Sequence, residues 1–195
     1  AWFPGKLSIG SDGYFLNAAG ELTIGNSSAV TVDGSTVGAQ VSNANGFTNS
    51  GNLKVVEDKS TLIVKGASFE NQGKIVVGEE KSDKEGKEGK IIANRQFINV
   101  GEIIVGKKGT LQVDGSLTNS KQLTVKGWTV PEPSTGDKED GGKLIVGTTG
   151  VDVENTGTME FAEGARFSTN SGSGIVVKNS GTLGIAKQDC IDTKI

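Results

Sequence analysis

The chain has no histidine and only one cysteine, Cys190, among its 195 residues. A single cysteine excludes a disulfide within the chain, and protein zinc sites are built mainly from cysteine and histidine. The composition therefore excludes a disulfide framework and predicts no cysteine or histidine metal centre. We expect Cys190 to be buried as a small apolar side chain, with a crosslink between two chains as the alternative.

Proline and aromatic residues are also scarce, with three prolines and 5% aromatics, and no segment shows the apolar spacing of a long helix. No apolar run reaches the roughly 20 residues that cross a bilayer, so we expect no membrane insertion. The net charge is -3, and charges of both signs are interspersed along the chain. Without a basic stripe, nucleic acid is not an expected partner.

Glycine is abundant, and it has a fixed place in one repeated pattern: apolar, any, Asn, any, Gly, any, apolar, any, apolar. The four clear copies are Phe47–Val55, Phe69–Val77, Phe97–Val105 and Val177–Ile185. Three looser copies begin at Phe15, Leu117 and Val153. Alternating apolar residues interrupted by a fixed turn and repeated along the chain indicate a solenoid.

A second pattern lies between the Asn turns and consists of an alternating strand that ends at a glycine, as in Leu62-Ile-Val64-Lys-Gly66 and Leu111-Gln-Val113-Asp-Gly115. The Asn-to-Asn steps are 32, 22, 28, 20, 36 and 24 residues, which suggests a coil of about 20 residues with insertions. We therefore predict an all-β fold: a parallel β-helix of about seven to eight coils, about 35 Å long at the spacing of paired strands. Residues 1–195 would form a single domain with two or three short strands per coil.

The repeated asparagines are predicted to stack from coil to coil as a hydrogen-bonded ladder. Asparagine also tolerates the left-handed backbone of tight turns, and the glycine two residues later accepts conformations that a Cβ disfavours. The alternative is that each Asn-x-Gly is a hairpin turn of an antiparallel barrel. The predicted ladder consists of Asn17, Asn49, Asn71, Asn99, Asn119, Asn155 and Asn179.

Departures from the repeat are expected at the ends and in loops, where a solenoid carries its function. Residues 1–14 are predicted to form an N-terminal cap, with Trp2 and Phe3 as a lid, and residues 186–195 a C-terminal tail or cap. Residues 79–89 and 128–140 are predicted loop insertions. Trp128 is the candidate ligand-binding residue because an exposed indole offers a flat face to a sugar; the alternative is that it packs against the coils. Glu79, Glu80 and Asp83 are weak candidates for calcium, since four lysines within or beside the loop oppose a cation there.

The Asn turns, together with Gly109-Thr-Leu111 and Gly181-Thr-Leu183, resemble the coils of bacterial surface adhesins with a β-helix fold. These are the filamentous-haemagglutinin-like proteins and autotransporter passengers; the tapirins, cellulose-binding surface proteins of thermophilic bacteria, are a further β-helical family with a similar Lys and Glu bias. The resemblance implies a right-handed helix, a cell-surface or secreted location, and adhesion.

The function expected from these features is that of a non-enzymatic extracellular protein: an adhesin, or a structural or self-assembling unit. It would bind polysaccharide or a surface protein through a solenoid face and its loops, without a cofactor, and its ends could join copies into an oligomer or filament. The alternative is a polysaccharide lyase or hydrolase on the same scaffold. Such enzymes need clustered carboxylates or a calcium site with an arginine base, whereas Glu21, Glu102 and Glu160 alternate with other residues.

Overall fold

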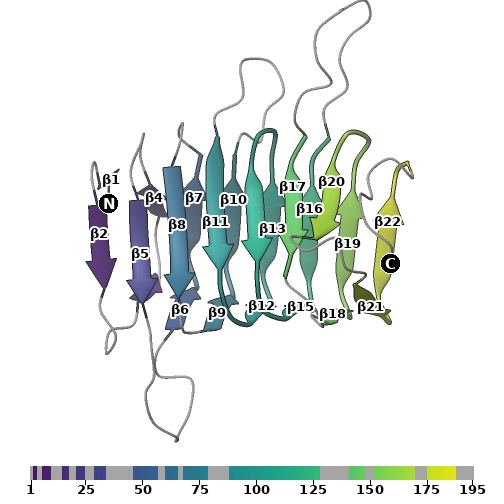
Figure 1. The fold of residues 1–195 in the computed structure, drawn as a ribbon, viewed down its shortest axis with the longest axis horizontal. Helices are drawn as coiled ribbons and strands as arrows, with labels where there is room; N and C mark the ends of the chain where they lie inside the picture. The colour runs from purple at the N-terminus through teal and green to yellow at the C-terminus, as the bar shows by residue number, and fades with distance from the viewer. Residues whose placement is uncertain are drawn as a thin grey trace, which may run out of the picture.

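The computed structural model of the chain forms three parallel sheets wound into a β-helix (Figure 1). It describes residues 2–3, 6–9, 15–17, 21–24, 29–33, 46–56, 60–65, 68–78, 88–127, 141–147, 152–169 and 175–187. Side chains are described within these ranges from Phe47 onward, except at positions 65 and 152. Every described element is a strand, a turn or an extended segment.

Each coil contributes one strand to each sheet, in the order sheet B, sheet C, sheet A. Sheet A contains β1 (Trp2–Phe3), β4 (Glu21–Ile24), β7 (Asn52–Val55), β10 (Lys74–Val77), β13 (Glu102–Val105), β16 (Gln122–Val125), β19 (Thr158–Phe161) and β22 (Thr182–Ile185). Sheet B contains β2 (Lys6–Ile9), β5 (Ala29–Asp33), β8 (Ser60–Lys65), β11 (Gly89–Ala93), β14 (Thr110–Val113), β17 (Lys143–Val146) and β20 (Arg166–Thr169). Sheet C contains β3 (Phe15–Asn17), β6 (Gly46–Asn49), β9 (Ser68–Asn71), β12 (Phe97–Asn99), β15 (Leu117–Asn119), β18 (Asp152–Asn155) and β21 (Val176–Asn179).

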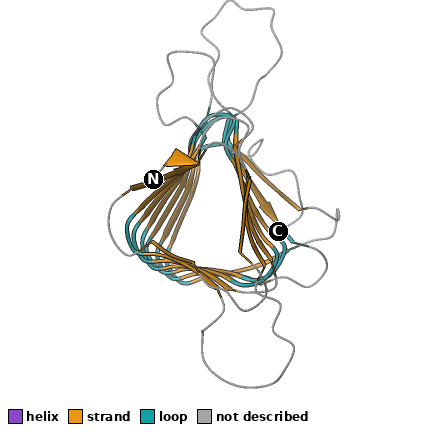
Figure 2. Cartoon of the chain, turned by 90° about the vertical axis from the view of Figure 1, so that its left-hand side faces the viewer, coloured by secondary structure: helices purple, strands orange, loops and turns teal. Residues whose placement is uncertain are grey.

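All pairs between the described strands are parallel. The hairpin-barrel alternative is therefore wrong, because hairpins would pair consecutive strands in opposite directions. Viewed along its axis the solenoid is a triangle with one sheet on each side (Figure 2). In Figure 1 the strands of sheet B run downward in front, those of sheet A run upward behind, and successive coils advance to the right, so the helix is right-handed.

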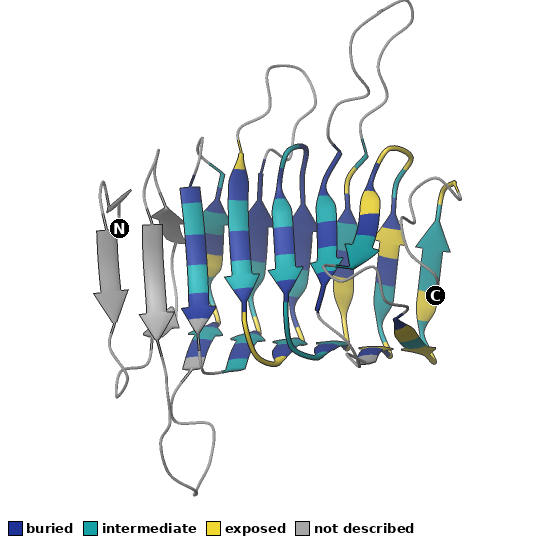
Figure 3. Cartoon of the chain, viewed as in Figure 1, coloured by how far each residue is buried: buried dark blue, intermediate teal, exposed yellow. Residues whose placement is uncertain are grey.

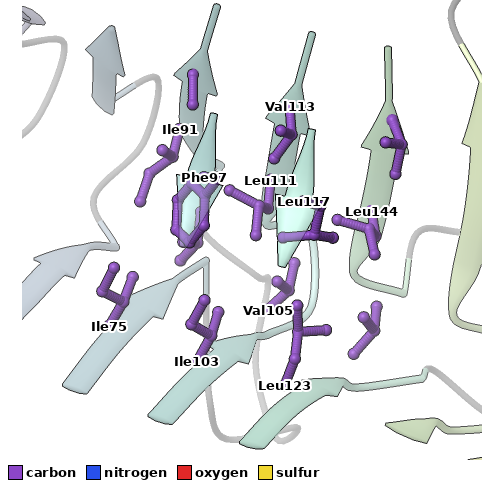
Figure 4. Close-up of a cluster of buried hydrophobic side chains, with 14 of the residues drawn as sticks. Ile75, Ile91, Phe97, Ile103, Val105, Leu111, Val113, Leu117, Leu123 and Leu144 are labelled. Atoms are coloured by element: carbon purple, nitrogen blue, oxygen red, sulfur yellow. The ribbon is translucent and has the colours of Figure 1, made fainter. Parts of the chain in front are cut away.

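The interior is filled by columns of aliphatic and aromatic side chains, because alternate residues of every strand point to the same side. Ile75, Ile103 and Leu123 are register partners on neighbouring strands and are fully buried. Figure 4 shows this column facing buried residues of the other two sheets, among them Leu111 and Leu117. The columns predicted from the repeat are thereby confirmed.

The Asn-x-Gly turn brings the backbones of successive coils into close contact at the corner between sheets C and A. A Cβ added to Gly101 would overlap the backbone carbonyl oxygen of Gly73 in the coil before it. The backbone amide of Glu102 meanwhile donates to that same oxygen at 2.8 Å. The glycine of the motif is thus required by the approach of one coil to the next.

The repeated asparagines form a continuous ladder at the same corner. Asn49, Asn71, Asn99, Asn119 and Asn155 are fully buried, and each donates from its side-chain Nδ2 to the side-chain Oδ1 of the next asparagine at 2.7–2.8 Å, ending at Asn179. Each of these Nδ2 groups also donates to a backbone carbonyl at the start of the sheet A strand in the following coil. Asn99, for example, donates to the carbonyl of Gln122 in β16 at 2.9 Å. The backbone of Asn17 is in register with Asn49, and its side chain lies outside the described residues.

The N-terminal segment contributes strands to the same sheets. Residues 2–3 form β1, which pairs with β4, and residues 6–9 form β2, which pairs with β5. The other residues of the predicted cap, 1, 4–5 and 10–14, lie outside the described residues, as do residues 188–195 of the predicted tail.

Candidate functional site

Several of the residues singled out from the sequence fall outside the described part of the chain. They are Trp128, Glu79, Glu80, Asp83 and Cys190. The segments that contain the first four connect β10 to β11 and β16 to β17, so each links a strand of sheet A to a strand of sheet B. The ligand and calcium hypotheses at these residues stay predictions.

The outer face of sheet B carries an aligned row of basic side chains. The first outward position of five successive strands is occupied by Thr61, Lys90, Thr110, Lys143 and Arg166, which are register partners from one strand to the next. Lys90 and Lys143 are half-buried and Arg166 is exposed. At the spacing of paired strands the row from Lys90 to Arg166 extends about 15 Å along the solenoid axis.

An aliphatic row runs beside the basic row on the same face. The next outward positions are Ile63, Ile92, Gln112, Ile145 and Ser168, again in register. The three isoleucines are half-buried, so part of each remains in contact with solvent. Sheet B faces the viewer in Figure 3, where intermediate and buried positions alternate along its strands. Its outer surface therefore combines fixed positive charge with exposed apolar area.

A carboxylate marks the far border of this face, directly after β14. Asp114 accepts hydrogen bonds from the side-chain amides of Asn94, at 3.1 Å, and Gln112, at 2.9 Å. Among the strand residues of sheet B with described side chains, the outward charges are three cations and no carboxylate. Asp114 thus lies outside the basic row, at the opposite side of the aliphatic row.

The outer face of sheet A differs in both charge and openness. Among its described side chains, the outward charges are those of two lysines and two glutamates, Lys54, Lys74, Glu102 and Glu160. The side-chain nitrogen of Lys74 lies 3.5 Å from a carboxylate oxygen of Glu102. Register partners Val76 and Ile104 occupy outward positions yet are only 5% and 6% exposed. This part of sheet A is therefore closed to a large ligand.

The carboxylates considered for catalysis are spread over sheet A. Glu102 on β13 and Glu160 on β19 are separated by the intervening strand β16, and the backbone of Glu21 lies on β4. Among the described residues, no three of the types His, Cys, Asp and Glu lie close enough together to hold a metal ion.

Sheet C presents a surface of mixed charge. Its outward strand positions include Thr48, Glu70, Ile98, Thr118, Glu154 and Lys178. Polar side chains of the adjoining corner bond to one another, as Ser50 does to Gln72 at 2.9 Å and Gln72 to Glu70 at 2.8 Å. Among the described side chains, sheet B is the one face on which cations align without carboxylates between them.

The basic row was missed in the sequence interpretation, although a signal was present. A cation precedes the alternating strand in Lys6-Leu-Ser-Ile9, Lys90-Ile-Ile-Ala93, Lys143-Leu-Ile-Val146 and Arg166-Phe-Ser-Thr169. Insertions make the sequence distances between these segments unequal. The cations are therefore seen to occupy the same strand position only when the strands are aligned by their hydrogen-bonded register, and not by a fixed repeat length.

Comparisons with known proteins identify no relative: no protein-family model, no curated protein and no solved structure matches the chain. Within the described ranges, the structure contains no helix long and apolar enough to cross a membrane.

Proposed function

We propose that the chain is a non-enzymatic extracellular surface protein that adheres to linear anionic polysaccharides along the outer face of sheet B. The observation that supports this most is the aligned row of Lys90, Lys143 and Arg166 beside the half-exposed isoleucines. The extracellular location rests on the composition of the chain and on its resemblance to surface adhesins.

The geometry of the row suits an extended polymer. Lys90 and Lys143 lie two strands apart, or about 10 Å at the spacing of paired strands, which is roughly the length of two linked sugar rings. Carboxylate or sulfate groups that recur along a glycan would meet cations that recur along the solenoid. Lysine and arginine both recognise such groups through charge-assisted hydrogen bonds.

The aliphatic row supplies the second half of the interaction. Sugar rings carry apolar C–H faces, and Ile63, Ile92 and Ile145 offer apolar area at three strands of the same face. Each contact would be shallow, because the contacting residues all lie on one face of a sheet. Affinity would therefore come from many sites on a long polymer engaging a rigid, preformed surface.

Binding to immobilised polysaccharides tests the proposal. Polygalacturonate, which carries carboxylates, and heparin, which carries sulfates as well, are compared with uncharged dextran. We expect both anionic polymers to bind, long chains to bind more tightly than oligosaccharides of a few rings, and added salt to weaken binding by screening.

Binding to dextran as strong as to the anionic polymers, or binding that is insensitive to salt, would contradict the proposal. The same incubations distinguish the enzymatic alternative, because a lyase or hydrolase shortens the polymer during the assay. We expect the polymer length to stay constant.

A further inference from the structure

The asparagine ladder ends at the C-terminal coil with donors that the next coil would normally use. Inside the solenoid, Nδ2 of Asn155 donates to Asn179 Oδ1 at 2.7 Å and to the backbone carbonyl of Thr182 at 2.8 Å, both in the following coil. Nδ2 of Asn179 donates to Gly181 of its own turn at 3.1 Å, and the residue is exposed. Among the described residues, no further coil supplies the two acceptors that every internal rung has.

The apolar core is also less deeply buried in the last described coil. Val153, Met159 and Phe161 are at most 2% exposed, whereas their partners in the last coil, Val177, Leu183 and Ile185, are only partly buried. Strands β20, β21 and β22 are the last strands of sheets B, C and A. An uncovered strand edge with apolar side chains beneath it is a template for a further strand.

We propose that the C-terminal end binds the N-terminal coil of a second copy, head to tail. A second copy shifted along the axis by the seven strands of sheets B and C would set β2 beside β20, β3 beside β21 and β4 beside β22. Sheet A has eight strands, so β22 would take the place that β1 holds beside β4, and β1 of the second copy would leave sheet A. All strands of a sheet already run in one direction, so these new pairs are parallel like the existing ones.

The register of the columns continues across such a junction. Asn17 and Asn179 lie at opposite ends of one register column of sheet C, and Phe15 and Val177 lie at opposite ends of another. The junction would extend the ladder by one rung and give the half-exposed apolar side chains a new layer. Lys6 and Arg166 share one row of sheet B and would become neighbours of like charge, which weakens the contact at low salt.

This contact joins two different surfaces, so it is heterologous, and it runs along the solenoid axis. Such contacts add copies without closing into a ring. The full chain should therefore form a concentration-dependent series of dimers, trimers and longer rods, strengthened rather than weakened by moderate salt.

Sedimentation velocity over a range of concentrations tests the inference. Asn179→Ala removes the open donor and should weaken association about fivefold, as expected for one lost hydrogen bond. Ile185→Lys places a charge in the junction and should weaken it about 100-fold or more. The matched control is Ser180→Ala, which changes the exposed neighbour of Asn179 and should leave association unchanged.

A mixing experiment keeps the test valid if Ile185→Lys loosens the last coil. A chain blocked at its C-terminal end still has an intact N-terminal end, so small amounts of either end variant should cap wild-type rods and shorten them. A chain that stays monomeric at the highest concentration, a series that stops at dimers, or association unaffected by both end variants would overturn the head-to-tail assignment.

Discussion

The side-chain amide of Asn71 donates a 2.8 Å hydrogen bond to the side-chain oxygen of Asn99, although 28 residues separate the two in sequence. Both residues are fully buried, and each also bonds the backbone of the following coil. The asparagine side chains thus hydrogen-bond to one another from coil to coil and hold each coil against the next. This explains why the repeat keeps asparagine at this turn while the residues on either side of it vary.

Removing an internal rung should therefore cost more than removing the last one. Asn99→Ala removes the acceptor of the side-chain amide of Asn71 and of the backbone amide of Gly101. It also removes the donor to the side-chain oxygen of Asn119 and to the backbone carbonyl of Gln122, and we expect a loss of roughly 1–3 kcal/mol in the free energy of unfolding. Asn179→Ala, at the exposed end, should cost a small part of that. Equal losses in urea denaturation of the two variants would remove the ladder from the account of stability.

Two glycines make a matched pair for the packing of the coils. At Gly101 a new Cβ would overlap the carbonyl oxygen of Gly73, so Gly101→Ala should destabilise by roughly 1–3 kcal/mol or more as the coils separate. At Gly184 the nearest atom to such a Cβ is 3.6 Å away, in the side chain of Glu160, so Gly184→Ala should be neutral or slightly stabilising. Thermal melting of both variants decides, and a harmless Gly101→Ala would disprove the close approach.

The aromatic column of sheet C predicts a large cavity effect. The ring of Phe69 lies between those of Phe47 and Phe97, with centroid separations of 4.7 and 4.5 Å, and all three residues are fully buried. Phe69→Ala removes both ring contacts and should cost about 3–5 kcal/mol. Phe69→Leu keeps most of the volume and should cost distinctly less, whereas similar unfolding midpoints for the two variants would argue against tight packing.

Burying a charge should be more damaging still. Val105 is fully buried among aliphatic side chains, so Val105→Asp has no partner for its carboxylate and should prevent stable folding. Thr124→Asp, at an outward position of the neighbouring strand β16, serves as the control and should fold normally. Circular dichroism and soluble yield report the difference, and a well-folded Val105→Asp protein would be inconsistent with the core described above.

The sequence was sufficient to predict the fold because the repeat encodes register directly. Residues such as Ile75, Ile103 and Leu123 occupy the same position of the same pattern, and parallel stacking follows once each is buried. The pattern left open whether two or three strands make a coil, since the strand after each glycine has no invariant polar residue to identify it. Three strands per coil is a result of the structure.

The candidate site was harder to predict, for a physical reason. A binding face on a solenoid is made of outward residues that the fold does not constrain, and their alignment depends on insertions of unequal length. Lys90 and Lys143 are 53 positions apart in sequence yet lie two strands apart on sheet B. The same freedom hides the burial of Val76 and Ile104, which alternation alone places at outward positions.

The most direct test of the proposed function compares two charge removals of equal size on different faces. The double variant Lys90→Gln/Lys143→Gln removes two of the three cations of the row on sheet B, and Lys54→Gln/Lys74→Gln removes two lysines from sheet A. We predict that the sheet B variant loses at least about tenfold in affinity for polygalacturonate, since each charge-assisted contact contributes about 1 kcal/mol or more. The sheet A variant should bind like the wild type, and both variants should have the melting temperature of the wild type. Equal losses in the two variants would show that binding follows net charge alone, and an unchanged sheet B variant would place the binding surface elsewhere; either result would contradict the account.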